Sequence, residues 1–340
     1  MAGASNCIIW KFDTRSRIMP IVTVTGPIPA SQAGYTLSHE HLLIDLWNLT
    51  RSYDAILDDE CLAIRELAEY RLAGGGSLVD ATSGGLGRNP AALRRISEAA
   101  GVRIIMGAGW YRERVYPAYV YERDTNGLAD LIVTDIMRGA DGTDVRAGII
   151  GEIGTERKYI TPAEERVFRA AARAHRRTGA CVMTHTTHFG ELAMEQIALL
   201  REESVPPNRI AISHLGDRHD TKQLLRIAGE GVFVSVDNIG YVGNGYPPDE
   251  VRMRNVMLLI EEGFLAQVVL GGDICQKSHL AAYGGKGYAH VPRCFLPLLR
   301  ANGIREEAIL QMTVANPARM LDIPDDFPTG AATSMSQEQT

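Results

Sequence analysis

Eight short runs of apolar and β-branched residues alternate with amphipathic segments along this chain, and that alternation restricts its fold more than any other feature. The runs span residues 36–40, 77–81, 103–107, 147–153, 181–185, 209–214, 232–236 and 267–271. Helical periodicity is found between them, in segments such as 58–73, 89–100, 162–178, 190–203 and 220–230. This order predicts an α/β fold, a (β/α)8 TIM barrel, with a doubly wound open sheet as the alternative.

The length of the chain fits one such barrel. Its 340 residues, 45% of them hydrophobic, can bury one large core, and no linker or low-complexity tract divides them. We expect a single domain over residues 19–323. Residues 1–18 have no clear periodicity and are expected to form an N-terminal extension. Residues 324–340, rich in Ser, Thr, Gly and Gln, are expected to form a disordered C-terminal tail.

Charge and cysteine content narrow the partners and the compartment. The formal net charge is −6, from 35 basic and 41 acidic residues, which disfavours nucleic acid and makes a small molecule the expected substrate. Five scattered cysteines without a C-x-x-C pair fit a reducing compartment. No apolar stretch approaches membrane-spanning length, and the N-terminus lacks the apolar core of a signal peptide. We therefore expect a cytoplasmic protein without a membrane partner.

Six residues with metal-ligating side chains stand at or just past the ends of these runs. They are His39, His41, Glu152, His185, His214 and Asp273. Side chains at the C-terminal ends of barrel strands converge on one point. His39 and His41, two residues apart, project to the same face, whereas Glu40 points the other way. Alone, an H-x-H pair also fits histidines that only satisfy hydrogen bonds, and Glu152 also fits a buried partner of an arginine. Their combination at five strand ends favours a metal site.

The types of ligand restrict the metal. Imidazole and carboxylate groups without thiolate suit Zn²⁺, Mn²⁺, Co²⁺ or Fe²⁺, and zinc is the first expectation. Six ligands exceed what one tetrahedral zinc ion with an open position requires, but they suit two divalent metal ions bridged by a carboxylate. Such a pair favours hydrolysis, because it acidifies water and polarises the bond to be cut. Asp80, Asp217 and Asp237 are candidates for orienting the imidazoles, and the glycines of LGGD for close approach of a ligand.

The ordered motifs resemble a known family. The segment TVTGPIPASQAGYTLSHEHLLID is similar to the opening of the phosphotriesterase-like branch of the amidohydrolase superfamily. The resemblance continues through GEIGT, THT, SHLGDRHD, VSVDNIG, LGGDI, YGGKGY and ANPARML, in that order. It covers residues 22–323, almost everything between the two ends. It implies a barrel hydrolase with two metal ions, and a homodimer.

The resemblance also implies a role for each ligand. His39, His41 and Asp273 correspond to ligands of the buried metal ion, and His185 and His214 to those of the more exposed one. Glu152 stands at the bridging position, where the best-known members have a carboxylated lysine and the phosphotriesterase-homology subgroup has glutamate. In the family mechanism a bridging hydroxide attacks the substrate, and Asp273 accepts its proton.

These implications favour a lactone or another carboxylic ester as the substrate. A glutamate bridge makes strong phosphotriesterase activity less expected, and the family contains many lactonases. The alternatives on the same metal site are an amidase or N-acyl hydrolase and a phosphoester hydrolase, including a TatD-like nuclease, since those enzymes also combine H-x-H with GEIG. A barrel that holds its metals but only binds small molecules or proteins is the third hypothesis.

Substrate contacts are expected from loops at the same face of the barrel. Trp110, Tyr111 and Arg114 follow the third run. Tyr111 resembles the tyrosine that lactonases of the family place against the substrate carbonyl, with ordinary packing as the alternative for both aromatic residues. Arg252 and Lys277 are candidates for binding a substrate carboxylate, although a charged loop residue is more often only solvated.

Overall fold

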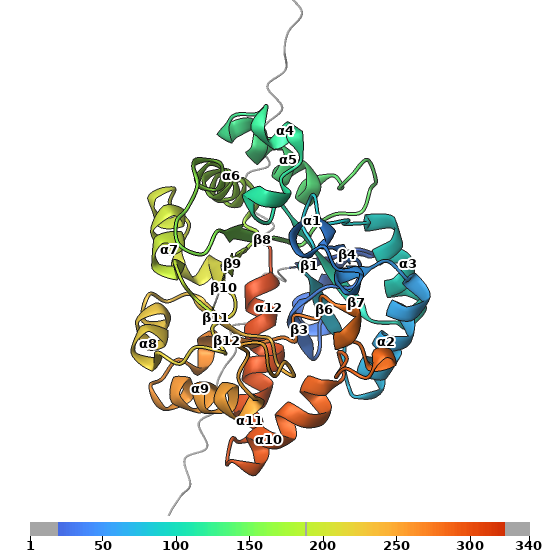
Figure 1. Ribbon diagram of the computed structural model, residues 1–340, viewed down its shortest axis with the longest axis vertical. Coiled ribbons are helices and arrows are strands. Elements are labelled where there is room, and N and C mark those ends of the chain that lie inside the picture. Colours follow the sequence, from blue (N-terminus) through green and yellow to red (C-terminus); the bar gives the residue numbers. More distant parts are fainter. Residues whose placement is uncertain (1–19, 188, 324–340) are drawn as a thin grey trace, which may run out of the picture.

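The computed structural model describes residues 20–187 and 189–323. Within them, eight strands form one sheet in the order β12-β11-β10-β9-β8-β7-β6-β3, all neighbours being parallel (Figure 1). They are β3 (Thr36–Glu40), β6 (Ser77–Asp80), β7 (Arg103–Ala108), β8 (Ile149–Thr155), β9 (Val182–Thr186), β10 (Ile210–Ile212), β11 (Phe233–Val236) and β12 (Val268–Leu270). All eight expected runs are therefore strands. The expected extension 1–18 and tail 324–340 lie outside the described residues.

The two ends of the sheet meet and nearly close it into a barrel. After β12, the backbone N–H of Asp273 donates to the carbonyl oxygen of His39 at 3.0 Å, and that of His41 donates to Ile274 at 3.2 Å. Gly271 is needed there, because a Cβ atom would lie 2.8 Å from the His39 carbonyl oxygen. This glycine makes room for β3, a different role from the ligand approach expected above. The predicted (β/α)8 TIM barrel is confirmed, and the open sheet is wrong.

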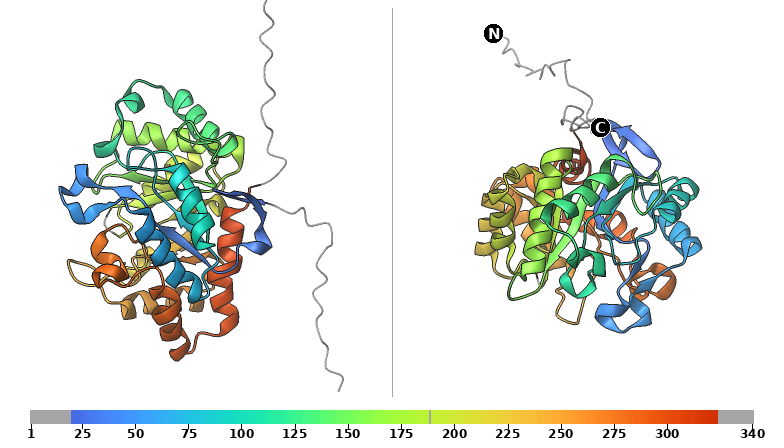
Figure 2. Two further views of the ribbon diagram at one scale, coloured as in Figure 1. Left: turned by 90° about the vertical axis from the view of Figure 1, so that its right-hand side faces the viewer. Right: turned by 90° about the horizontal axis from the view of Figure 1, so that it is seen from above.

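Helices cover the outside of the strands (Figures 1 and 2). The longer ones are α2 (Glu60–Leu72), α3 (Pro90–Ala100), α5 (Thr125–Met137), α6 (Pro162–Thr178), α7 (Ala193–Glu202), α8 (Thr221–Gly229) and α9 (Asp249–Glu261). Shorter elements are α1 (Trp47–Thr50), α4 (Ala118–Tyr121), α10 (Leu296–Ala301), α11 (Glu306–Leu310), α12 (Asn316–Leu321) and the strand pair β4 (Ile44–Asp45) with β5 (Ile56–Leu57). The five expected helical segments correspond to α2, α3, α6, α7 and α8. No helix of the described ranges is long and apolar enough to cross a membrane.

Local sequence signals explain where the helices begin and end, as α6 illustrates. Thr161 and Glu164 form a reciprocal capping box, with the Thr161 hydroxyl accepting from the Glu164 N–H at 3.1 Å and the Glu164 carboxylate accepting from the Thr161 N–H at 3.0 Å. Pro162 occupies the first turn, where its missing N–H costs nothing. Gly179 ends the helix at φ 73°, a left-handed conformation that glycine adopts without strain.

Successive side chains along each strand point alternately into the barrel and towards the helices, which divides the core into two layers. On β7, Ile105 packs inside the barrel, whereas Ile104 and Met106 face the helices. The inner layer consists of Ile21, Ala33, Val79, Ala81, Ile105, Ile149, Cys181, Met183, Ala211, Phe233, Val269, Met320 and Leu321. Its last members belong to α12, which lies beside the hairpin of β1 (Pro20–Thr23) and β2 (Gly26–Pro29) in Figure 2. These elements close one end of the barrel, and the other end carries the polar residues.

Candidate metal centre

All six candidate ligands lie at the C-terminal end of the barrel and converge. His39, Glu152 and His185 belong to β3, β8 and β9, whereas His41, His214 and Asp273 follow β3, β10 and β12 within three residues. They form three overlapping groups whose ligand atoms lie within 4.8 Å of one another. The groups are His39–His41–Glu152, His39–His214–Asp273 and Glu152–His185–His214. The barrel thus joins side chains from five separate strand ends in one cluster.

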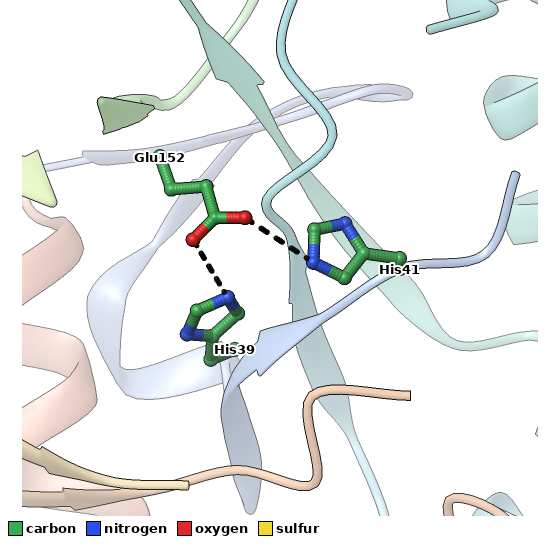
Figure 3. Close-up of side chains that lie close together, drawn as sticks. All are labelled: His39, His41 and Glu152. Carbon is green, nitrogen blue, oxygen red and sulfur yellow. Dashed lines mark ion pairs between the residues drawn. The ribbon is translucent and has the colours of Figure 1, made fainter. Parts of the chain in front are cut away.

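Glu152 occupies the middle of this cluster and is 3% exposed. Its Oε1 lies 3.5 Å from Nε2 of His41, and its Oε2 lies 3.3 Å from Nε2 of His39 (Figure 3). The same Oε2 is 3.1 Å from Nδ1 of His185. The two carboxylate oxygens therefore face different histidines, as a carboxylate that bridges two metal ions requires.

Asp273 faces the same histidines from the cavity side. Its Oδ1 lies 3.2 Å from Nε2 of His41 and 3.6 Å from Nε2 of His39. The side chain is 14% exposed, more than any other carboxylate or imidazole of the cluster. Behind it, the Glu40 carboxylate accepts hydrogen bonds from the N–H groups of Gly272 and Ile274 at 2.5 and 3.1 Å. Glu40 thus points away from the cluster, as expected, and fixes the turn that carries Asp273.

Hydrogen bonds on the far side of the imidazoles fix their orientation. One carboxylate, Asp237, contacts Nδ1 of His39 at 3.1 Å and Nδ1 of His214 at 2.8 Å, so both rings present Nε2 to the cluster. The orienting role predicted for Asp237 is confirmed. Nδ1 of His41 contacts the Thr82 hydroxyl at 2.9 Å, a partner that sequence analysis did not identify.

The other two candidates for this orienting role have different partners. Asp80 accepts hydrogen bonds from the backbone N–H groups of Leu42 and Thr82. Asp217 forms an ion pair with Arg252 and accepts a hydrogen bond from the Asn238 side chain. Both carboxylates therefore hold the loops around the cluster, and the imidazoles only indirectly.

We expect Asp237→Asn to weaken metal binding about 10- to 100-fold, because the two imidazoles contact different oxygens of Asp237 and the carboxamide replaces one of them with an N–H₂ donor. Chelator competition with metal analysis would measure this loss. Asp135→Asn is the matched control, since this partly buried carboxylate pairs with Arg88 at 2.8 Å outside the cluster. Equal metal affinity in both variants would show that Asp237 does not position the ligands.

Burial and neighbouring charges shift the pKa values of several candidate ligands. Burial would raise the pKa of Glu152, but His39 and His185 outweigh it and hold that pKa well below the usual value. Burial lowers the pKa of His185 to about 4, so this ring is neutral at pH 7. Burial disfavours the charged form of His214, but the Asp237 carboxylate outweighs it and raises the pKa to about 9. Metal binding must therefore displace a proton from His214.

The residues fit divalent metal ions. Nε2 of His39 is buried and makes no hydrogen bond of normal geometry among the described residues, although the Glu152 carboxylate lies 3.3 Å away and a buried ring nitrogen normally has a partner. It points into a set of imidazole and carboxylate atoms without thiolate, which suits Zn²⁺, Mn²⁺, Co²⁺ or Fe²⁺. A cation at this place would satisfy the nitrogen and neutralise the two carboxylates together.

A cavity of about 380 Å³ opens beside the cluster. Its lining consists of Tyr111, Arg112, Arg157, His185, Thr186, Thr187, Phe189, His214, Asn238, Asn244, Gly245, Tyr246 and Asp273. Among the proposed substrate contacts, Tyr111 lies here, with its hydroxyl 2.8 Å from Nε2 of His185. Arg112, Arg157 and Phe189 are lining residues that sequence analysis did not identify.

The structure places the other proposed substrate contacts elsewhere. Trp110 is buried and donates to the Tyr119 hydroxyl at 3.0 Å. Arg252 is 0% exposed, and its guanidinium is neutralised by Asp217 at 2.6 Å and Asp249 at 2.7 Å, which leaves no charge to offer a substrate. Lys277 lines a separate hollow. None of the three lines the cavity beside the cluster, as far as the described residues define it.

A barrel with imidazole and carboxylate groups gathered at the C-terminal ends of its strands is the architecture of metal-dependent barrel hydrolases. Comparison with known proteins adds the family, because the Phosphotriesterase family pattern matches residues 19–321. The chain belongs to the phosphotriesterase family of the amidohydrolase superfamily and is a metal-dependent hydrolase. The resemblance found in the sequence is confirmed, and the overlapping groups of ligands indicate a binuclear metal site typical of this family.

Three relatives illustrate the range of the family. The phosphotriesterase homology protein of Escherichia coli is 36% identical over 84% of this chain and 97% of its own, and its crystal structure, with phosphate in the active site, has a TM-score of 0.82. N-acetyltaurine hydrolase of Danio rerio is 31% identical over 88% of this chain and 97% of its own. A lactonase from Listeria monocytogenes is 29% identical, covers 89% of this chain and 98% of its own, and has a TM-score of 0.83.

Proposed function

We propose that this protein hydrolyses a lactone or another carboxylic ester at the metal centre. The observation that carries this proposal is the position of Glu152, whose two oxygens face different histidines in the manner of a bridging carboxylate. The lactonase among the relatives supports the substrate class. The ligands are proposed to be His39, His41, Glu152, His185, His214 and Asp273, with two divalent ions, zinc first and Mn, Co or Fe as the other candidates.

Two residues would act directly on the substrate. Divalent metals, when bound, make water more acidic and polarise the ester carbonyl. Asp273 is the catalytic residue that accepts the proton of the attacking water, because its carboxylate borders both the cluster and the cavity. Burial raises the pKa of Tyr111 well above its ordinary value, so its hydroxyl stays protonated. His185 presents Nδ1 to the cluster, so its Nε2–H donates to the Tyr111 hydroxyl. Tyr111 is then free to donate its own proton in a hydrogen bond to the carbonyl oxygen of the substrate.

We expect Tyr111→Phe to reduce kcat/KM for esters about 10- to 100-fold, the cost of one hydrogen bond to an oxygen that gains charge. Steady-state kinetics at saturating metal would measure it. Tyr116→Phe is the matched control, because Tyr116 lies in the same loop and does not line the cavity beside the cluster. If both variants keep wild-type kinetics, Tyr111 only packs against His185.

Amide hydrolysis is the second candidate. N-acetyltaurine hydrolases, relatives that match 88% of this chain, act on an amide. The same two metal ions and the same proton acceptor would serve an amide, whose leaving amine needs a proton more than an alkoxide does. Hydrolysis of a phosphoester, including a nucleic acid, is the remaining alternative for this site.

A substrate panel separates these candidates. It contains γ- and δ-lactones, aryl esters, N-acyl amino acids, paraoxon and single-stranded DNA, each assayed before and after chelation. We expect turnover of lactones or esters, lost on chelation and restored by a divalent ion, in a protein that carries about two metal equivalents per chain. Full activity in a metal-free protein would refute the metal mechanism, and turnover of only amides or only phosphoesters would replace the ester proposal.

Further proposals concern the cellular setting. The net charge of −6 supports a small-molecule substrate rather than nucleic acid. Scattered cysteines support a cytoplasmic location, and we propose no membrane partner. Homodimer formation is proposed from the family alone. We also propose that residues 19–323 form one hydrolase domain between two terminal segments.

A further inference from the structure

Outside the metal cluster, the charged side chains that line the cavity are positive. Besides Asp273 and His214, which belong to the metal cluster, the charged side chains among its described lining residues are two arginines, Arg112 and Arg157. A cavity that only had to admit a neutral ester would not need a cation in its wall, because burying a charge without a partner is costly.

Arg112 is the less neutralised of the two arginines. Its side chain is 13% exposed, and its NH1 group donates to the Thr187 hydroxyl at 3.1 Å. Its Nε is buried and has no hydrogen-bond acceptor among the described residues. The nearest carboxylate, Glu156, lies 3.7 Å from that Nε and also lies 3.4 Å from Arg114. Within the described residues, Arg112 therefore lines the cavity with its charge balanced only by a carboxylate that it shares with Arg114.

Arg157 is engaged elsewhere. Its guanidinium contacts the Glu191 carboxylate at 3.1 and 3.5 Å, and its side chain is 49% exposed. Solvent screens such a pair, and the Glu191 charge offsets that of Arg157, so Arg157 adds little positive potential to the wall. Arg112 is thus the principal cation of the cavity.

The cavity also has an aromatic side, formed by Phe189 and Tyr246, whose ring centroids lie 5.3 Å apart in an edge-to-face arrangement. A ligand that fits all three surfaces has a polar group for the metals, a hydrocarbon body for the aromatic rings and an anion for the arginine.

We infer that Arg112, together with the Thr187 hydroxyl, binds an anionic group of the substrate, a carboxylate or a sulfonate, while the bond to be cut lies at the metal cluster. The guanidinium presents several N–H donors in a plane, which matches the oxygens of such a group. This inference rests on the proposed hydrolase function and narrows its substrates to esters or amides that carry a negative charge at the end away from the metals.

Binding of probes that cannot be hydrolysed tests the subsite without turnover. Butyrate offers one carboxylate, whereas glutarate and 4-sulfobutyrate offer a second anion, so the ratio of their dissociation constants isolates the Arg112 contact. We expect glutarate or 4-sulfobutyrate to bind the metal-loaded protein about 10- to 100-fold more tightly than butyrate in calorimetry. Which of the two anions binds better identifies the preferred group, carboxylate or sulfonate.

Variants of the same loop provide the controls. Arg112→Gln should abolish the preference for the second anion and leave butyrate binding within about threefold, whereas Arg112→Lys should retain part of the preference. Arg114→Gln removes the same charge two residues away, from a side chain that is 69% exposed, and should keep the whole preference. Thermal melts show whether each variant is folded, and an unfolded Arg112→Gln leaves the Arg112→Lys comparison decisive.

The outcomes separate this inference from the function on which it rests. If the wild-type protein binds all three probes equally, or if Arg112→Gln and Arg112→Lys keep the full preference, the anionic subsite is refuted even when lactones or esters are hydrolysed. If the preference depends on Arg112 but no ester or amide is turned over, the subsite stands and the proposed hydrolysis fails.

Discussion

Replacing Glu152 with glutamine is expected to remove tight binding of both metal ions and to reduce hydrolysis more than about 100-fold. Loss of a residue that only hydrogen-bonds to a metal ligand already costs up to about 100-fold in metal affinity or activity, and Glu152 is proposed to be a ligand itself. Glu152 is the one side chain whose oxygens face His41 on one side and His39 and His185 on the other. Glutamine keeps the size but has no negative charge, and it presents an N–H₂ group to one half of the site.

Metal analysis, activity and thermal melting together test this expectation. The variant should carry less than one equivalent of metal, and its melting temperature should no longer respond to added metal, since only a folded state with a site is stabilised by the ion. Glu156→Gln, four residues further along the chain and outside the cluster, should retain the metal and the response. Two metal equivalents and wild-type rates in Glu152→Gln would contradict the bridging role.

Much of the cluster was predictable because barrel geometry converts sequence position into spatial position. A polar residue that ends an apolar strand points towards the axis of the barrel, so Glu152 and His185 could be assigned to one site although 33 residues separate them. The two-residue spacing of His39 and His41 added a second constraint. The eight strands were predictable for a similar reason, since buried parallel strands are short continuous apolar runs.

Contacts that depend on folding partners were not predictable in this way. Arg252 looked like a free loop cation, but Asp217, far away in the sequence, neutralises it inside the protein. In the loop after β7, two arginines that are two residues apart lie in different environments, since Arg112 faces the cavity and Arg114 faces solvent. The loop has no periodicity from which this difference could be read.

The hairpin of β1 and β2, which helps to close the far end of the barrel, was not predicted because of the composition of β2. The segment of β2, GPIP, contains two prolines, which normally argue against a strand. The hairpin has only two strands, so both are edges, where a missing N–H is tolerated. Its pairing with β1 and its contact with α12 could only be seen in three dimensions.

Asp273→Asn is expected to lower kcat about 10²- to 10⁴-fold, the usual contribution of a positioned proton acceptor. Unlike Glu152, Asp273 borders the cavity, with one oxygen 3.2 Å from Nε2 of His41, so it combines a ligand with a base. Asparagine keeps an oxygen for the metal but loses the charge that accepts a proton. With excess metal, the variant should therefore regain both equivalents and still turn over slowly.

Comparison with Glu152→Gln separates the two roles of Asp273. Both variants should be measured over a range of metal concentrations, with metal content, kcat and KM determined at each. A defect only in metal holding would disappear as metal is added, whereas loss of the proton acceptor leaves kcat low when the site is full, with KM nearly unchanged. Recovery of wild-type kcat in metal-saturated Asp273→Asn would show that Asp273 is only a ligand and that another group, or solvent, takes the proton.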